Sequence, residues 1–213
     1  MQPLKELRAR LLRRRQEVGG AKEEILTRVG HSPALGPADL ARLRYRSQDA
    51  RILTFAEFLG LVAGRVPLLV EVKSEWDPPD RAFLGEIARL AAGYEGALAL
   101  MSFDPAVMTV LKDLAPGVAR GIVSGGYRDE HGETWWPEKI SPERGRRLAD
   151  LLESGPVEPH FFAYHVKSLP TPVTELQRKV MGLPLFTWTV RSPEDRAIAA
   201  QWADTPIFEG FEP

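Results

Sequence analysis

Glu71 and Lys73 are the residues of this sequence whose types and spacing best suit chemistry. They follow the apolar run Val66–Val70, and side chains two apart on a strand point to the same face. A carboxylate and an ammonium at the end of a buried strand predict a site at the carboxyl edge of a parallel sheet, where α/β proteins place their chemistry. The alternative is an ion pair at a solvated strand end, and the pair alone leaves the two interpretations evenly balanced.

Strands and helices alternate from residue 52 onward. Thr54 predicts a helix N-cap with Glu57 as its capping-box partner, and Ser141 and Ser192 predict caps followed by proline. Apolar runs predict strands at 66–73, 97–101, 119–123, 161–166, 185–190 and 207–211, and helical spacing predicts helices at 80–92, 105–114, 141–152, 174–181 and from 193. Units of about 30 residues indicate an α/β fold, TIM-barrel-like, with about six parallel strands and helices outside.

The composition is that of a globular protein and excludes several classes of function. The chain has 213 residues, of which 44% are hydrophobic and 27% charged, so it fits one large domain or two small ones. A net charge of −1 provides no field that would attract nucleic acid. The chain has no cysteine, no apolar stretch long enough for a membrane span and no signal-peptide core at its start. We therefore expect a soluble, cytoplasmic protein.

The first 50 residues differ in character from the rest. Residues 3–28 are highly charged and carry leucines at helical spacing. The basic run Arg13–Arg15 is flanked by acidic residues and has no aromatic neighbours, which favours a solvated helix face over a nucleic-acid contact. We predict a charged helical segment over 1–50 and an α/β barrel domain over 51–213.

Three predicted strand ends carry short motifs in a fixed order: Glu71-Val72-Lys73, Ser102-Phe103-Asp104 and Thr187-Trp188-Thr189-Val190. The stretch Ile52–Leu59 precedes the first of them. In order and rhythm these segments resemble the glycerophosphodiester phosphodiesterase family, which places a similar helix before its Glu-x-Lys strand. The resemblance covers about residues 50–213, and it depends on the order of the motifs more than on any one of them.

The resemblance implies a metal-dependent hydrolase of lipid metabolism that cleaves glycerophosphodiesters to glycerol 3-phosphate and an alcohol. It implies Glu71 as a ligand of Mg²⁺ or Ca²⁺ and Lys73 beside the phosphate. It also implies Ser102 and Phe103 on the pocket wall, and Trp188 against the glycerol carbons. A hard cation and an ammonium group would together neutralise the charge of the breaking phosphodiester.

The sequence departs from the family ahead of Glu71. It has no His-Arg-Gly, and neither the strand with Glu-x-Asp nor the His-Asp hairpin precedes Glu71, where Lys22-Glu23 stands in the hairpin's place. The family's acid–base histidines and further metal ligands are thus missing, so we assign no catalytic residue and expect little turnover. The chain reads as a barrel without the family's first two strands, from a truncated gene or a true pseudoenzyme. The alternatives are a non-catalytic phosphate-ester binder and a self-associating remnant that forms a homo-oligomer.

Four further side chains are open to two interpretations. His165, near the end of the fourth strand, is a possible acid or base, although a histidine without a chemical role is favoured. Trp135 and Trp136 lie in the long connection 124–140 and either cap the substrate's alcohol or only anchor the loop. Glu209 lies in an apolar strand and needs a partner such as Lys73 or an arginine. The remaining candidates are interpreted as solvated: His31, His131, His160 and Glu75.

Overall fold

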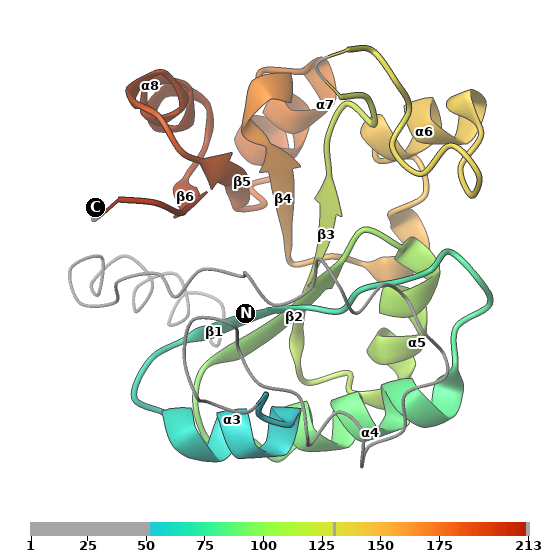
Figure 1. The fold of residues 1–213 in the computed structure, drawn as a ribbon, viewed down its shortest axis with the longest axis vertical. Coiled ribbons are helices and arrows are strands. Elements are labelled where there is room, and N and C mark those ends of the chain that lie inside the picture. Colours follow the sequence, from blue (N-terminus) through green and yellow to red (C-terminus); the bar gives the residue numbers. More distant parts are fainter. Residues whose placement is uncertain (1–51, 130, 212–213) are drawn as a thin grey trace.

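Six parallel strands form one curved sheet in the computed structural model, which describes residues 52–129 and 131–211 (Figure 1). Each strand is hydrogen-bonded to the next one along the chain, in the order β1-β2-β3-β4-β5-β6. The sheet curls into a half-barrel, which confirms the predicted TIM-barrel-like α/β class. The strands are β1 (Leu68–Glu71), β2 (Leu98–Ser102), β3 (Ala119–Ser124), β4 (Phe161–His165), β5 (Leu185–Val190) and β6 (Thr205–Phe208).

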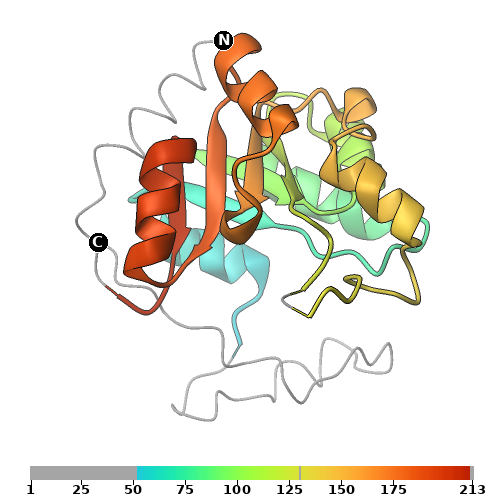
Figure 2. The same cartoon turned by 90° about the horizontal axis from the view of Figure 1, so that it is seen from above.

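Helices follow the strands and lie around the outside of the sheet (Figure 2). This placement is the right-handed crossover arrangement expected between neighbouring parallel strands. The helices are α3 (Phe55–Val62), α4 (Arg81–Ala92), α5 (Pro105–Leu114), α6 (Pro142–Ala149), α7 (Pro172–Glu175) and α8 (Pro193–Trp202), with short 3₁₀ turns at Gly155–Val157 and Val166–Ser168. Among the described residues, no helix combines the length and the apolar character needed to cross a membrane.

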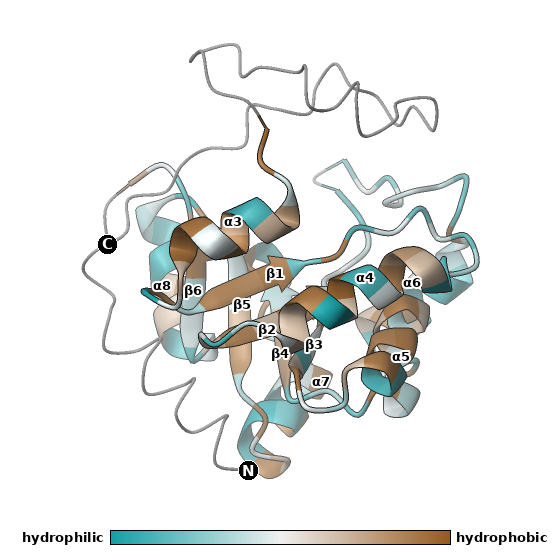
Figure 3. Cartoon of the chain, turned by 90° about the horizontal axis from the view of Figure 1, so that it is seen from below, coloured by the Kyte–Doolittle hydropathy of each residue, from teal (hydrophilic) through white to brown (hydrophobic). Residues whose placement is uncertain are grey.

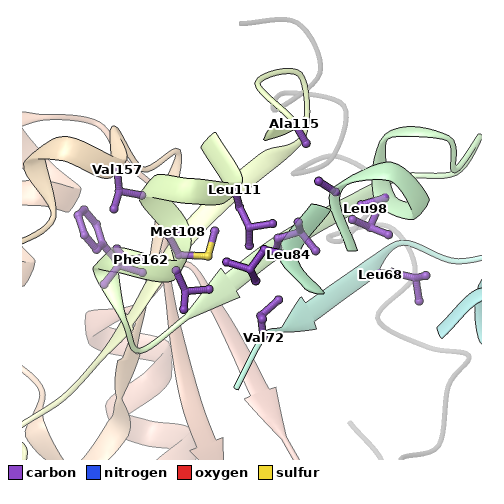
Figure 4. Close-up of a cluster of buried hydrophobic side chains, with 14 of the residues drawn as sticks. Leu68, Val72, Leu84, Leu98, Met108, Leu111, Ala115, Val157 and Phe162 are labelled. Atoms are coloured by element: carbon purple, nitrogen blue, oxygen red, sulfur yellow. The ribbon is translucent and has the colours of Figure 1, made fainter. Parts of the chain in front are cut away.

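The two faces of the sheet bury different side chains. On the outer face, strand residues such as Leu98 and Phe162 share one apolar cluster with Leu84 of α4 and Met108 of α5 (Figure 4). The inner face carries a second apolar cluster that includes Ala163 and the stacked rings of Phe161 and Phe186. Both faces of the strands are therefore apolar, as Figure 3 shows by its colouring, and this is typical of a parallel sheet.

Side-chain caps fix where most of the helices begin. Thr54 and Glu57 form the predicted capping box of α3, and the Ser192 hydroxyl accepts a hydrogen bond from the backbone N–H of Asp195. Asp104 caps α5 by accepting from the N–H of Ala106. Each cap satisfies a backbone donor that the helix itself cannot pair, so the first turn is defined locally by the sequence.

Four predicted elements have wrong boundaries. The strand predicted at 66–73 is Leu68–Glu71, so Lys73 lies beyond its end. The helix predicted at 141–152 ends at Ala149, because Leu151 has a left-handed backbone. The helix predicted at 174–181 begins at Pro172, capped by Thr171, and continues as a π-helical turn at Leu176–Val180. The last strand is Thr205–Phe208 instead of 207–211, because a proline is tolerated in a strand at the end of a sheet.

Several predictions fall on residues that lie outside the described part of the chain. These are the helices expected within 3–28, the basic run Arg13–Arg15, His31 and Lys22-Glu23. The division into a segment 1–50 and a domain 51–213 likewise stays a prediction.

Candidate functional site

Four side chains that the sequence analysis named as candidates for a functional site lie on the inner face of the sheet at its carboxyl edge. Phe103 and Trp188 pack on the inner apolar cluster. Glu71 and His165 lie two residues beyond Leu69 and Ala163 of that cluster, so alternation along the strand places them on the same face. In the register of β4 and β5, His165 is directly opposite Trp188. The carboxyl edge of the inner face is therefore the candidate site.

Glu71 and Lys73 form an ion pair at this edge. Lys73 Nζ donates to Glu71 Oε1 at 2.9 Å, and the two side chains are 71% and 24% exposed, respectively. The pair thus combines both interpretations of the sequence, because it lies at the carboxyl edge and it is an ion pair with a solvated lysine. An exposed ammonium of this kind can move to a ligand at small cost, because surface pairs contribute at most about 1 kcal/mol.

Aromatic rings line the rest of the edge, and Phe103 is at their centre. Its ring centroid lies 5.3 Å from that of Trp188, 5.1 Å from that of Trp136 and 6.3 Å from that of Trp135. Edge-to-face contacts dominate, which is the favoured geometry for aromatic pairs. We call the following residues the aromatic cluster: Trp76, Phe103, Tyr127, Trp135, Trp136, His165 and Trp188.

Two loops meet over the aromatic cluster, one after β1 and one after β3. Trp76 of the first loop packs 5.5 Å from Trp136 of the second, and Lys139 Nζ donates to Asp77 Oδ1 at 2.8 Å. Trp76, Tyr127 and Trp136 all have positive φ angles, which are rare for bulky residues. Such conformations persist only where the surrounding contacts hold them, and they are commonest at functional sites.

Tyr127 is the most deeply buried member of the aromatic cluster. It is 1% exposed, and its hydroxyl lacks a hydrogen-bond partner among the described residues. Burial raises the pKa of Tyr127 far above its ordinary value, because an apolar environment disfavours the phenolate. The residue therefore stays protonated at neutral pH and supports the cluster as a neutral ring.

His165 is held between two indole rings. Its ring centroid lies 4.9 Å from that of Trp188 and 5.5 Å from that of Trp135. Burial lowers the pKa of His165, and the positive charges of Lys167 and Arg191 lower it further, whereas Asp195 raises it. His165 is consequently neutral at pH 7.

A divalent cation does not fit the described residues. Glu71 is a single carboxylate that Lys73 already pairs. Across residues 52–129 and 131–211, no group of three or more histidine, aspartate or glutamate side chains comes together. Mg²⁺ and Ca²⁺ take several oxygen ligands, so this part of the chain does not provide the metal site that the resemblance implies.

The other residues considered in the sequence lie outside the aromatic cluster. Ser102 is fully buried on the helix-facing side, where its hydroxyl accepts from the N–H of Asp104, so it does not lie on the expected pocket wall. Glu209 follows β6 and pairs with Arg191, not with Lys73. His160 is not a solvated histidine, because its Nδ1 accepts from the N–H of Arg120 at 3.1 Å. His131 and Glu75 are exposed, as expected.

Two residues of the site were not predicted from the sequence. Trp76 joins the aromatic cluster, and its position three residues after Lys73 was the available signal. Ser168 bonds to His165 and to the N–H of Gly126, and no sequence pattern marked it. The contacts of Trp76 with Trp136 and of Ser168 with Gly126 join segments that are far apart along the chain.

Comparison with known proteins gives matches to solved structures only. No family model and no curated protein matches the sequence. A protein from Silicibacter pomeroyi described as a glycerophosphoryl diester phosphodiesterase superposes with a TM-score of 0.55 at 22% identity, covering 74% of this chain. A phosphodiesterase from Oleispira antarctica, solved in complex with the product sn-glycerol-3-phosphate, gives 0.54 at 16% identity over 80% of this chain. A glycerophosphodiester phosphodiesterase from Parabacteroides distasonis gives 0.51 at 18% identity over 81%.

The chain has part of the glycerophosphodiester phosphodiesterase fold. It spans 53% of the Silicibacter protein and 65% of the Oleispira protein, so it corresponds to a portion of each. The glycerophosphodiester phosphodiesterase fold confirms, at the level of architecture, the resemblance read from the three strand-end motifs.

Proposed function

We propose that this chain belongs to the glycerophosphodiester phosphodiesterase family and binds glycerophosphodiesters or their phosphate products at the carboxyl edge of the sheet. The observation that supports the proposal is that Glu71, Phe103 and Trp188 occupy strand ends on the inner face of a sheet with the family's fold, with Lys73 paired to Glu71. Lys73 supplies a positive charge for the phosphate, and the aromatic cluster supplies apolar surface for the carbon chain.

Binding is the part of this function that the described residues support best. Lys73 is mostly exposed, and within the described part of the chain it pairs with Glu71 alone, so it can contact an anion from solvent. The neighbouring Oleispira protein holds sn-glycerol-3-phosphate, which makes that compound the natural probe for this chain. Isothermal titration calorimetry with glycerol 3-phosphate should give measurable heat, and the absence of both heat and a thermal shift would contradict the proposal.

Metal-dependent hydrolysis to glycerol 3-phosphate and an alcohol is the second candidate, favoured by the fold alone. It needs a metal site and an acid–base pair that residues 52–129 and 131–211 do not bring together. We expect the purified chain to release little glycerol 3-phosphate from glycerophosphocholine in the presence of Mg²⁺ or Ca²⁺. Rapid release that EDTA abolishes would establish hydrolysis and show that other residues complete the site.

A further inference from the structure

His165 has one ring nitrogen engaged and the other free. Nδ1 lies 3.3 Å from Ser168 Oγ. Nε2 has no hydrogen-bond partner in the described part of the chain, and it is not among the fully buried unpaired atoms. The imidazole therefore presents an accessible polar atom at the carboxyl edge of the inner face.

Ser168 can select one tautomer of His165 by donating its hydroxyl proton to Nδ1. The Ser168 hydroxyl oxygen accepts a hydrogen bond from the Gly126 N–H at 3.0 Å. The hydroxyl proton has a single acceptor among the described residues, which is His165 Nδ1. With Nδ1 accepting, a neutral imidazole must carry its proton on Nε2.

The residues around His165 restrict the orientation of its imidazole ring. Trp188 Nε1 donates to the Ala163 carbonyl at 3.0 Å, so this indole is locked in place beside the imidazole. A side-chain carbon at Gly125 would approach His165 Cβ to 2.7 Å and the Trp135 ring to 2.8 Å. Only glycine at 125 allows both rings to lie this close, and packing between two indoles strengthens any hydrogen bond from the imidazole.

Charged side chains of both signs surround the ring. Lys167 and Arg191 both lie near enough to His165 to act on it electrostatically, and their side chains are 59% and 63% exposed. Asp195 and Glu209 pair with these two cations, and the exposed Glu194 also acts on Lys167. An anionic ligand is therefore favoured by the hydrogen-bond donor at Nε2 and by the exposed ammonium of Lys167, not by the net charge of this corner.

We propose that His165 donates its Nε2 proton as a hydrogen bond to an anionic oxygen of the bound phosphate ester, and that Ser168 is the positioning residue that holds the required tautomer. This inference rests on the proposed function and adds a residue that the strand-end motifs do not include. Because the proton is shared and not transferred, His165 is a binding group and no bond of the ligand is broken by it.

The first test is the tautomer of His165 in the ligand-free protein. Long-range ¹H–¹⁵N correlation spectra of labelled protein distinguish the two neutral tautomers, and H165Q identifies the His165 signals. We expect the proton on Nε2 in the wild type and a mixture of tautomers in S168A. A proton on Nδ1 in the wild type would overturn the inference whether or not any ligand binds.

The second test compares the affinity of variants for glycerol 3-phosphate by calorimetry. H165F keeps an aromatic ring between the indoles but has no donor, and we expect it to weaken binding about ten- to hundredfold. H165Q places an amide N–H near the position of Nε2 and should recover part of that loss. H131Q, at an exposed loop histidine, is the matched control, and thermal melting verifies that each variant is folded.

The outcomes separate this inference from the proposed function. If the wild type binds and H165F binds equally well, the inference fails and the proposed function stands. If H165F and H165Q are both folded and equally weak, a donor near the position of Nε2 does not restore binding, and the inference fails. If the wild type does not bind glycerol 3-phosphate at all, both are overturned.

Discussion

Single charged groups at the carboxyl edge divide into those that can meet a ligand and those that stabilise the fold. Lys73 belongs to the first kind, because its ammonium is mostly solvated and, in residues 52–129 and 131–211, pairs with Glu71 alone. Asp195 belongs to the second, because it is buried, its carboxylate accepts from the N–H of Arg191, and its own N–H donates to Ser192, the N-cap of α8. This division decides which substitutions should change binding and which should change stability.

K73M should weaken binding of glycerol 3-phosphate about tenfold or more while leaving the free energy of unfolding within about 0.5 kcal/mol of wild type. The ammonium is lost as a phosphate partner, whereas the exposed pair with Glu71 contributes little to stability. Calorimetry and urea unfolding measure the two quantities. K179M, which removes a comparably exposed lysine paired with Glu175 on the outer side, is the control and should leave binding unchanged.

Stability should fall as the pH drops below about 6.5. Burial lowers the pKa of both His160 and His165 in the folded state, so the unfolded chain takes up protons first as the pH falls. The free energy of unfolding then rises with pH between the lowered pKa values and about 6.5. Above that range the contribution of the two histidines to stability is complete. Urea unfolding at pH 5.5 and 7.5 tests this sign, and equal stability at both values would contradict it.

At the level of elements, Asp104 joins a strand end, a helix and a loop. It is 2% exposed, it accepts from the N–H of Ala106 at 2.9 Å to cap α5, and it accepts from Ser74 Oγ at 2.6 Å. The loop after β1 is thereby attached to the helix after β2. The acidic residue of the Ser102-Phe103-Asp104 motif thus has a structural role in this chain.

D104A should destabilise the protein by about 2 kcal/mol or more, because it removes a helix cap and leaves a partly buried hydroxyl without its acceptor. D80A is the matched control, since Asp80 caps α4 in the same way but is exposed. Its cost should be close to the usual value of about 1 kcal/mol. Chemical denaturation measures both, and equal losses would show that the bond to Ser74 is not important.

Sequence patterns located these elements well where the signal was local. The caps at Thr54, Ser141 and Ser192 and the alternating apolar strands gave every strand and most helix starts. The errors came from conformations that the pattern does not encode, such as the left-handed Leu151 and the edge-strand Pro206. Within the site, Glu71, Phe103 and Trp188 were predicted, because they occupy strand ends on the inner face.

Contacts between distant loops could not be predicted in the same way. The bond from the Gly126 N–H to Ser168 joins segments 42 residues apart, and the contact of Trp76 with Trp136 joins two loops 60 residues apart. Ser102 shows the converse error, since alternation turns it to the helix side while its neighbour Phe103 faces inward. Tertiary packing, not residue type, decides such placements.

For the molecule as a whole, we expect its stability to be independent of divalent cations. The described residues gather no group of metal ligands, so Mg²⁺ has no site there through which to favour the folded state. Neither EDTA nor millimolar Mg²⁺ should move the thermal midpoint by more than about 1 °C. A rise of several degrees with Mg²⁺ would show that residues beyond the described ranges complete a metal site.

The sheet has β1 and β6 as its end strands in the described part of the chain. Unpaired strand edges favour association, so the homo-oligomer suggested by the sequence stays a prediction at this scale. Light scattering across a range of concentrations tests it, and a constant monomer mass would contradict it.

The distribution of tryptophan gives the protein a built-in optical signal. The chain has five tryptophans, and all but Trp202 belong to the aromatic cluster at the carboxyl edge. Intrinsic emission and near-ultraviolet dichroism therefore report mainly on that edge, where indoles lie close enough to exchange excitation. Binding of a ligand at this edge should change the intrinsic tryptophan fluorescence. The affinity can therefore be measured on the wild-type protein without an attached label.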